Sequence, residues 1–228
     1  MTEENRNPLE ALGQYALRYV KPGQTIGLGT GRAANAFIRA LGASGIEVRG
    51  VPTSKASEEV GRAAGIEIVS LSDFPKIDTD FDGADEVDSR LNLMKGYGGA
   101  LVREKIVAAS SRRFIVMVSE EKIVRHLGSR RRLPVEVVPF SAPLVIKKTA
   151  ALGLKPKIRT EDTGGVFITD NGNLILDCGI AKIPNAARLD RELLAIPGVV
   201  GTGLFVGMAD LILVAGDGGR ISTLRARR

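Results

Sequence analysis

The stretch that decides the fold is Thr25-Ile26-Gly27-Leu28-Gly29-Thr30-Gly31. Its apolar start predicts a strand, and its glycines predict a tight turn into a helix over residues 32–41 that Gly42 ends. Backbone N–H groups and the helix dipole favour an anion at such a turn. A dinucleotide fingerprint is excluded, because the third glycine of G-x-G-x-x-G would fall on Arg32, and no Gly-Lys-Ser/Thr follows to make a P-loop. From this stretch alone, phosphate or sugar binding and a purely structural turn both stay open.

Predicted helices and strands alternate on both sides of this turn. Asn7 and Pro8 are typical of a helix start, and Ser54 is expected to cap a helix that stops at Gly65. Further strands are predicted at residues 46–51 and 66–71. Short connections between alternating elements favour a Rossmann-like parallel sheet flanked by helices.

The pattern changes after Gly128. Asn171-Gly172 is the strongest short signal for a hairpin, and apolar residues at 166–169 and 174–176 flank it. The remaining predicted elements are strands at 134–138 and 199–205 and helices at 143–152 and 185–195. Hairpin strands with two helices between them predict a smaller α+β domain of ferredoxin-like type. The apolar run 211–214 is expected to rejoin the first sheet. We therefore predict a Rossmann-like domain from residues 1–129 and 206–228, and a small domain from residues 130–205.

Composition limits the class of protein. The chain has 228 residues, of which 44% are hydrophobic and 25% charged, as in an ordinary globular protein. No apolar run approaches the roughly 18 residues of a membrane span, and the polar, acidic start does not resemble a secretory signal. The single cysteine, Cys178, excludes an internal disulfide and a thiolate metal cage. A cytoplasmic protein is expected.

The formal charge of +6 raises the question of nucleic acid. Arginines cluster at Arg130-Arg131-Arg132, but aromatic residues make up only 4% of the chain and tryptophan is absent, so a platform for stacking bases is not expected. A basic chain also suits an enzyme that attracts anionic substrates. We expect no nucleic-acid partner and no membrane partner.

A dense acidic run, Asp82-Gly83-Ala84-Asp85-Glu86, follows the next predicted strand. A calcium loop over residues 78–89 is rejected, because Ser89 stands where the loop needs a bidentate Glu and Asp85 stands at its apolar eighth position. Apolar neighbours indicate a buried strand end, where open α/β sheets bind ligands. The carboxylates are therefore candidates for acid–base chemistry, with a solvated acidic loop as the alternative.

A second glycine-rich loop, Lys95-Gly96-Tyr97-Gly98-Gly99, follows a predicted strand at 91–94 and leads into a helix that carries Glu104. Such a loop offers backbone donors to an oxyanion, and Lys95 adds a full charge. Glu104 lies close enough to the helix start to face the same cavity. Its alternative is a surface position, since Arg103 and Lys105 flank it.

These motifs together resemble ribose-5-phosphate isomerase, type A, over nearly the whole chain. The matching stretches, in order, are residues 27–31, Thr53-Ser54, 82–86, 95–105, Glu121-Lys122, 134–137, 171–173 and 196–200. The order and spacing of residues 82–105 make this the most specific part of the match.

The resemblance implies an aldose–ketose isomerase that interconverts D-ribose 5-phosphate and D-ribulose 5-phosphate in the non-oxidative pentose phosphate pathway, without metal or organic cofactor. It implies that Glu104 moves a proton between C2 and C1 through an enediolate, assisted by Asp82, Asp85 and Lys95. It also implies a homodimer or homotetramer whose only other partner is a small-molecule sugar phosphate. The substrate-binding residues that it implies are Gly29, Thr30, Gly31, Arg32, Ala33, Gly83, Ala84, Gly96, Tyr97, Gly98 and Lys122.

The chain departs from the family pattern at four places. Arg32-Ala33 replaces a usual Ser-Thr, and the lysine usual near the phosphate is replaced around Leu9. We hypothesise that Arg32 compensates, because a guanidinium binds phosphate through two parallel donors. Tyr97 replaces a usual glycine, and Ser119 a usual aspartate. Since Lys122 follows Ser119 closely, its setting is affected as well.

Three other functions are weighed against an isomerase of this type. An amino-sugar-phosphate isomerase or deaminase fits less well, because the chain has one histidine, His126, which we interpret as structural. A sugar-phosphate-sensing module of a repressor is disfavoured by the full catalytic set and by the single helix expected before the first strand. A nucleic-acid binder depends on the charge alone.

Overall fold

The computed structural model describes residues 7–225, which form two compact units. Unit 1 consists of the described residues up to Ala84, of Arg103–Lys122, and of those from Met208 onward. Unit 2 consists of Asp85–Val102 and Ile123–Gly207. The predicted fold class is confirmed: one unit holds a largely parallel sheet flanked by helices, and the other is a smaller α+β unit.

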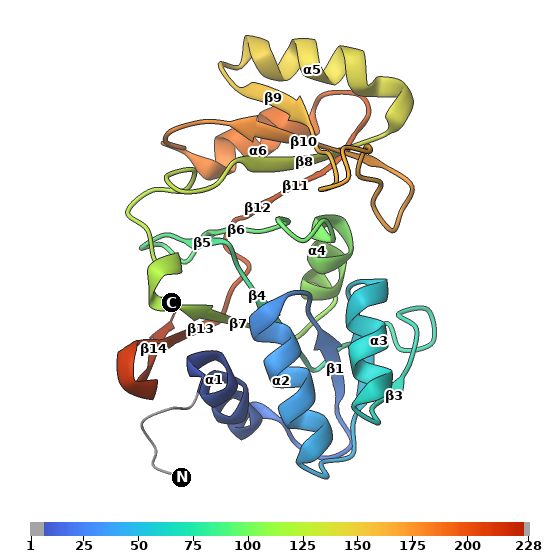
Figure 1. Cartoon of the computed structure of the whole chain (residues 1–228), viewed down its shortest axis with the longest axis vertical. Coiled ribbons are helices and arrows are strands. Elements are labelled where there is room, and N and C mark those ends of the chain that lie inside the picture. Colours follow the sequence, from blue (N-terminus) through green and yellow to red (C-terminus); the bar gives the residue numbers. More distant parts are fainter. Residues whose placement is uncertain (1–6, 226–228) are drawn as a thin grey trace. The chain divides into compact units, whose positions relative to one another are not determined.

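Unit 1 is built on a seven-stranded sheet of order β14-β13-β7-β4-β1-β2-β3. Figure 1 labels its strands β14, β13, β7, β4, β1 and β3. Its strands are β1 (Thr25–Leu28), β2 (Arg49–Pro52), β3 (Glu67–Ile68), β4 (Thr79–Gly83), β7 (Phe114–Ser119), β13 (Leu211–Ala215) and β14 (Ile221–Arg225). Neighbouring strands run parallel except for β13 and β14. The apolar run 211–214 therefore joins the first sheet, as expected. The carboxyl ends of the parallel strands share one edge, where α/β sheets bind ligands.

Helices cover both faces of this sheet. They are α1 (Pro8–Ala16), α2 (Arg32–Ala43), α3 (Lys55–Ala63) and α4 (Leu101–Ala109). Leu28 and Phe81 join the core under α1 and α2, where the rings of Phe37 and Phe81 stack at 4.2 Å. Side chains alternate along a strand, so the neighbouring positions face the other way. There a Cβ atom on Gly27 would lie 2.8 Å from Val107 Cγ1 on α4.

Unit 2 contains a four-stranded antiparallel sheet of order β11-β8-β10-β9. Its elements follow the chain as β8 (Leu133–Val137), α5 (Ala142–Ala151), β9 (Lys155–Ile158), β10 (Leu174–Gly179), α6 (Ala186–Leu194) and β11 (Val199–Thr202). This is the βαββαβ arrangement of a ferredoxin-like domain, as predicted. Val145 of α5 and Leu193 of α6 pack with Val135, Leu176 and Cys178 in one core.

A second, three-stranded sheet in unit 2 has the order β12-β6-β5. Its strands are β5 (Glu86–Val87), β6 (Leu93–Met94) and β12 (Leu204–Phe205). The short 3-10 helices of the chain are η2 (Leu17–Tyr19), η3 (Glu120–Lys122), η4 (Pro139–Ser141) and η5 (Asp217–Gly219).

The starts of the helices agree with the sequence-based predictions better than their ends do. Asn7 and Asn185 each accept a hydrogen bond from the first turn of the helix they precede, and Ser54 forms a capping box with Ser57. The prediction that Gly42 ends α2 was wrong. The helix runs on to Ala43. Glycine is needed at position 42 because a Cβ there would lie 2.2 Å from the Ala64 carbonyl oxygen.

Several predicted strands are shorter or divided. The predicted strand 199–205 splits into β11 and β12, which belong to different sheets. The split falls at Gly203, whose N–H donates to the Pro134 carbonyl and whose own carbonyl accepts from Lys95 N–H. Residues 166–169 form only isolated bridges, to Thr160 and Leu174. The Asn171-Gly172 turn is present, with Gly172 at φ 78°.

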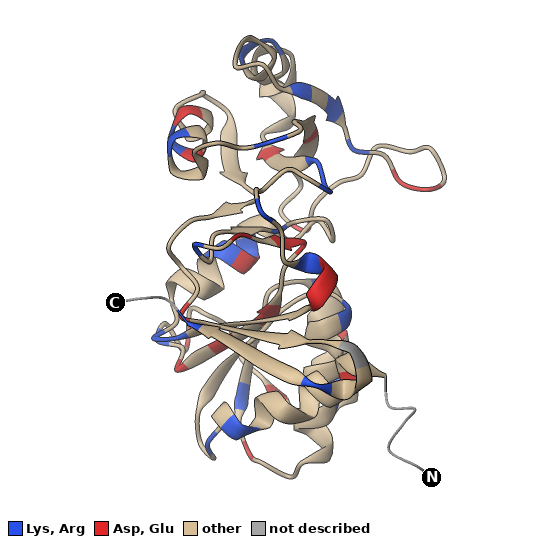
Figure 2. Ribbon diagram, turned by 90° about the vertical axis from the view of Figure 1, so that its left-hand side faces the viewer, with Lys and Arg blue, Asp and Glu red and all other residues tan. Residues whose placement is uncertain are grey.

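Two further features are the distribution of charged residues and the hydropathy of the helices. Segments with Lys or Arg and segments with Asp or Glu are interspersed within each unit (Figure 2). Within residues 7–225, none of the helices has the length and apolar character needed to cross a membrane.

Candidate active site

Asp82 and the first glycine turn form one packed structure in unit 1. The parallel register pairs Gly27 with Asp80 and Leu28 with Phe81, so Asp82 lies beside Gly29 at the carboxyl edge of the sheet. A Cβ atom on Gly29 would lie 2.3 Å from Asp82 Oδ1 and 2.5 Å from Asp82 Cα. The same Oδ1 accepts hydrogen bonds from the N–H groups of Thr30 (3.0 Å) and Gly83 (2.7 Å). Gly29 is therefore required because the buried Asp82 carboxylate fills the place of its side chain.

Hydroxyl groups between the end of β2 and the start of α3 also hold the glycine turn at residues 29–31. Thr30 Oγ1 lies 2.8 Å from Thr53 Oγ1 and 2.7 Å from Ser54 Oγ, at the point where β2 leads into α3. Gly31 then takes φ 108°, which favours glycine, and α2 begins at Arg32. In the described part of the chain no side chain caps the first turn of α2, so the turn presents a rigid helix start of the kind that binds phosphate.

The charges of Arg32 and Lys122 act on the same carboxylate, Glu121. The pKa of Glu121 is lowered chiefly because the Ser119 hydroxyl donates a hydrogen bond to it, and the charges of Lys122 and Arg32 lower it further. Ser119 ends β7, and Glu121 and Lys122 belong to η3. The charges of Arg32 and Lys122, both predicted site residues, thus act on one acidic residue to which the sequence analysis gave no role.

Glu104 lies on α4 and is only 3% exposed. It precedes Val107 by three residues, so the two share one helix face. Val107 contacts the sheet beside Gly27, on the face toward which Asp80 also points. The alternation of β4 puts Asp82 on this face too. The surface alternative for Glu104 is wrong, because its side chain is buried on the sheet face that carries Asp82.

Lys95 and Asp85 belong to unit 2. The Lys95 side chain is buried, with Nζ 5.5 Å from the centre of the Phe205 ring, and its backbone N–H donates to Gly203. Asp85 Oδ2 accepts a hydrogen bond of 3.0 Å from Tyr97 N–H. Gly96 takes φ 100° and is buried, whereas Tyr97 and Gly98 are exposed. The loop after β6 is therefore ordered by Asp85 and not only by its glycines.

The remaining predicted residues sit at the edge of unit 1. Gly83 ends β4, and a Cβ atom on it would lie 4.0 Å from the Ala33 side chain, an ordinary contact. Ala84 follows and is partly buried. Gly83 and Ala33 thus face each other beside Asp82.

Glu86 was part of the predicted acidic run, but no role was assigned to it. Its buried carboxylate accepts three backbone hydrogen bonds, from Gly128 (2.6 Å), Arg130 (2.6 Å) and Arg131 (2.8 Å). It fixes the loop that carries the arginine cluster. The available signal was its place in the acidic run beside Val87, which does not reveal a partner more than 40 residues away.

Titratable groups elsewhere have structural settings. Burial, as the main cause, raises the pKa of the Cys178 thiol to about 12, so this thiol is inert at neutral pH. Glu136 is buried and accepts hydrogen bonds from Thr169, Asn171 and Asn173, which orders the hairpin turn. Among the residues described, no cluster of three or more His, Cys, Asp or Glu is arranged to hold a metal ion.

Comparison with known proteins gives one family. The family model described as ribose 5-phosphate isomerase A (phosphoriboisomerase A) matches residues 49–219. The ribose-5-phosphate isomerase A of Roseiflexus castenholzii is 49% identical over 209 residues, covering 90% of this chain and 89% of that protein. The solved ribose 5-phosphate isomerase A of Methanocaldococcus jannaschii superposes with a TM-score of 0.91 at 38% identity, covering 96% of this chain and 98% of that one.

A further solved structure is a D-ribose-5-phosphate isomerase in complex with phospho-erythronic acid. It has a TM-score of 0.91 at 36% identity, and covers 96% of this chain and 97% of that one. The relatives and solved structures cover 90% or more of this chain, and the family model covers residues 49–219. The chain belongs to the ribose 5-phosphate isomerase A family.

Proposed function

We propose that this protein is an aldose–ketose isomerase that interconverts D-ribose 5-phosphate and D-ribulose 5-phosphate, a step of the non-oxidative pentose phosphate pathway. Family membership over most of the chain supports this activity, and a relative has been solved with the sugar-acid phosphate phospho-erythronic acid. The observation that carries the proposal is the edge of the parallel sheet in unit 1. There the buried Asp82 carboxylate is bonded into a glycine turn that starts a helix, and Glu104 is buried on the same sheet face.

Glu104 is the proposed base. A 1,2 proton shift needs one carboxylate that takes a proton from C2 and returns it to C1 of the same enediolate. A buried carboxylate on a helix is held in one orientation and is shielded from bulk water, and both properties suit a proton that must be returned to a neighbouring carbon. The 3% exposure of Glu104 meets this requirement.

Lys95, Asp82 and Asp85 are the proposed assisting groups. The enediolate carries negative charge on oxygen, and an ammonium group such as that of Lys95 stabilises it. Asp82 and Asp85 are proposed to assist ring opening, which needs a proton moved between the ring oxygen and the hydroxyl on C1. Asp85 also accepts a hydrogen bond from Tyr97 N–H, which supports a second contribution through the order of the Lys95 loop.

The phosphate is proposed to bind at the start of α2. The backbone N–H groups of Gly31 and Ala33 are the proposed donors there, and Arg32 and Lys122 supply positive charge. Gly29 and Thr30 are proposed to shape the site, since their own N–H groups donate to Phe81 and Asp82. The nearby Glu121 carboxylate balances part of that charge in the free protein. We propose that Arg32 takes the place of missing hydroxyl donors. The further proposed contacts to the sugar are Gly83, Ala84, Gly96, Tyr97 and Gly98.

We further propose a cytoplasmic enzyme that assembles as a homodimer or homotetramer and needs neither metal nor organic cofactor. A single buried cysteine fits a reducing compartment, and phosphorylated pentoses are charged metabolites that do not cross membranes freely. The division into a Rossmann-like domain of residues 1–129 and 206–228 and a small domain of residues 130–205 is retained as a proposal about folding domains. Expressing residues 130–205 alone tests it.

The test of function is conversion of ribose 5-phosphate to the ketose by purified protein in the presence of EDTA. We expect the wild type to be active and Glu104→Gln to lose at least about 1,000-fold in kcat, since removal of a catalytic base is among the largest single effects. Glu58→Gln, which alters an exposed ion pair on α3, is the matched control and should retain activity. Wild-type protein that binds sugar phosphate without converting it would favour the sensing module instead.

A further inference from the structure

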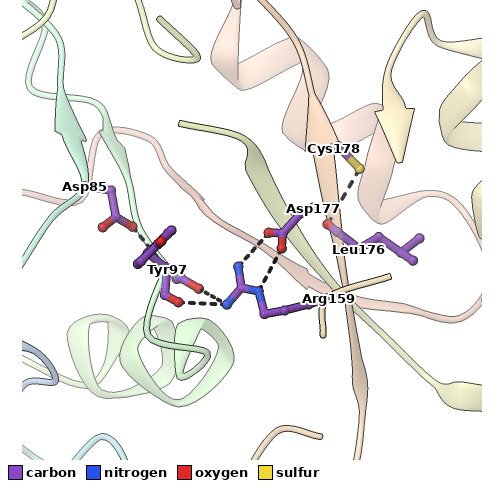
Figure 3. A network of polar contacts seen from close by, with 7 residues as sticks. Asp85, Tyr97, Arg159, Leu176, Asp177 and Cys178 are labelled. Atoms are coloured by element: carbon purple, nitrogen blue, oxygen red, sulfur yellow. Dashed lines mark hydrogen bonds and ion pairs between the residues drawn. The ribbon is translucent and has the colours of Figure 1, made fainter. Parts of the chain in front are cut away.

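Arg159 connects the four-stranded sheet of unit 2 to the backbone of the Lys95 loop (Figure 3). Its Nε and Nη2 atoms donate to the two oxygens of Asp177 at 2.9 and 2.6 Å. Its Nη1 donates to the carbonyl oxygens of Gly96 and Tyr97, both at 2.9 Å. One planar guanidinium therefore makes four hydrogen bonds, two that fix its own orientation and two that fix the loop.

Arg159 and Asp177 lie on the face of the four-stranded sheet opposite its helix-covered core. Asp177 lies on β10 opposite Lys157 of β9, and Arg159 follows two residues later, on the same face by alternation. Leu176 and Cys178 point to the opposite face, into the helix-covered core. The side chains of Arg159 and Asp177 are 11% and 23% exposed, so the pair is largely removed from water. Such charge-assisted, bidentate pairs are among the strongest polar contacts in proteins.

Arg159 adds to the support that the loop receives from Asp85 and Gly203. Gly96 has φ 100° and Gly99 has φ 86°, and glycine gives the chain more conformational freedom than any other residue. The Tyr97 side chain is 63% exposed, so burial does not hold it. The Arg131 guanidinium lies 4.6 Å from the centre of its ring, and that of Arg159 lies 6.0 Å away. Phe167, whose N–H donates to the Arg159 carbonyl, packs where a side chain on Gly99 would be.

We propose that Arg159, oriented by Asp177, is a positioning residue for Lys95: it holds the carbonyls of Gly96 and Tyr97 so that the preceding lysine keeps its catalytic placement. The inference rests on the proposed function, in which Lys95 stabilises the charged intermediate. A charged group that stabilises an intermediate must lie close to the charge it stabilises, so a small displacement of Lys95 should lower the reaction rate strongly. Phosphate binding, proposed at the start of α2, does not involve this network.

The experiment compares four variants with the wild type, by steady-state kinetics with ribose 5-phosphate and by hydrogen exchange of backbone amides. For Arg159→Ala we expect kcat to fall roughly 10- to 100-fold and KM to change less than about threefold. Arg159→Lys keeps the charge but cannot make four hydrogen bonds in one plane, so it should recover little activity. Asp177→Asn keeps the shape and should lose roughly three- to tenfold. Arg188→Ala breaks an exposed pair with Glu192 on α6 and should match the wild type.

Hydrogen exchange gives a readout that needs no activity. The N–H groups of Lys95, Tyr97 and Gly99 donate to Gly203, Asp85 and Gly96 respectively. In Arg159→Ala these three amides should exchange at least roughly tenfold faster, while amides of β1 and β7 keep their protection. Circular dichroism checks that each variant folds. If Arg159→Ala does not fold, Arg159→Lys and Asp177→Asn are judged by the same two measurements.

The proposal is overturned if kcat of the folded Arg159 variants stays within threefold of the wild type, or if kcat falls while the loop amides keep their protection. A wild-type protein without isomerase activity would instead refute the proposed function. In that case the exchange rates still decide whether Arg159 holds the loop.

Discussion

The two glycine-rich loops of this protein look alike in sequence but are held in different ways. Each follows a short strand and leads into a helix: residues 29–31 into α2, and residues 95–99 toward α4. The first is held by close packing, since the Asp82 carboxylate occupies the side-chain space of Gly29 and bonds to Thr30 N–H. The second is held by polar side chains from other parts of the chain, namely Asp85 and Arg159. The first loop is thus part of the sheet edge, whereas the second is attached to its surroundings by polar contacts that can be removed one at a time.

Gly29→Ala should have the largest effect on stability, because it places a methyl group in the closely packed first loop. The new methyl group would lie 2.3 to 2.5 Å from Asp82 side-chain and backbone atoms, so the turn or the strand must shift. We expect a loss of about 3 kcal/mol in the free energy of unfolding, as for overpacking of a tight site, together with loss of isomerase activity. Urea denaturation measures the first and steady-state kinetics the second.

Gly165→Ala is the control for this substitution. The nearest atoms to a Cβ there lie 3.9 Å away and its φ is not positive, so its stability should be unchanged. If Gly29→Ala is as stable and active as Gly165→Ala, the packing account of the first loop is wrong.

Glu86→Gln should have the next largest effect on stability. It also tests the second loop, because Glu86 holds the backbone of Arg131, whose guanidinium lies 4.6 Å from the centre of the Tyr97 ring. Three backbone N–H groups lose a charged acceptor, and one of them is left facing an amide NH₂ group. We expect a loss of about 2 kcal/mol in unfolding free energy, with the arginine loop around Arg131 becoming more mobile. Denaturation of Glu86→Gln beside Glu59→Gln, an exposed residue of α3, separates this anchor from a general effect of removing a negative charge. Equal stability of the two variants would contradict the anchoring role.

Arg32→Ala tests the phosphate end of the first loop. Loss of one guanidinium contact to phosphate should raise KM for ribose 5-phosphate roughly tenfold while kcat stays nearly constant. Arg39→Ala, further along the same helix, is the matched control. An unchanged KM in Arg32→Ala would remove Arg32 from the proposed binding site.

Ser119→Ala should have the smallest effect, and it acts through pH. Because the folded protein lowers the pKa of Glu121, this group adds stability that is present above the pKa of the unfolded chain and is lost as the pH falls through the folded value. Loss of the Ser119 hydroxyl should move the Glu121 pKa back toward 4.5. An NMR titration of the Glu121 carboxyl in both proteins measures the shift. A Glu121 titration that is identical in both would show that Ser119 does not hold this carboxylate.

The difference between the loops also explains how much the sequence could predict. Strand, turn and helix around Gly29 are encoded by neighbouring residues, and so are the helix caps at Asn7, Ser54 and Asn185. These features could be read from local patterns. The contact of Asp177 with Arg159 is encoded by two residues 18 positions apart, and the contact of Arg159 with the loop spans 62 or 63 positions. No local pattern reveals such pairs.

Some predicted boundaries of strands and helices were wrong for a related reason. Apolar character continues from Val199 to Phe205, so one strand was predicted, yet Gly203 exchanges backbone hydrogen bonds with Lys95 and Pro134 and divides it. Gly42 was taken as a helix end because glycine often has that role, whereas here it allows close approach of Ala64. A partner distant in sequence thus divides the strand at Gly203 and accounts for the glycine at position 42.

The central claim is that Glu104 moves a proton on the carbon skeleton of a pentose phosphate. The most direct measurement is the reaction of ribose 5-phosphate in deuterated water, followed by proton NMR of the carbon-bound positions C1 and C2. The wild type should form ribulose 5-phosphate and retain at C1 part of the proton taken from C2, whereas Glu104→Gln should do neither while remaining folded. Isomerisation by Glu104→Gln at the wild-type rate would contradict the role of Glu104.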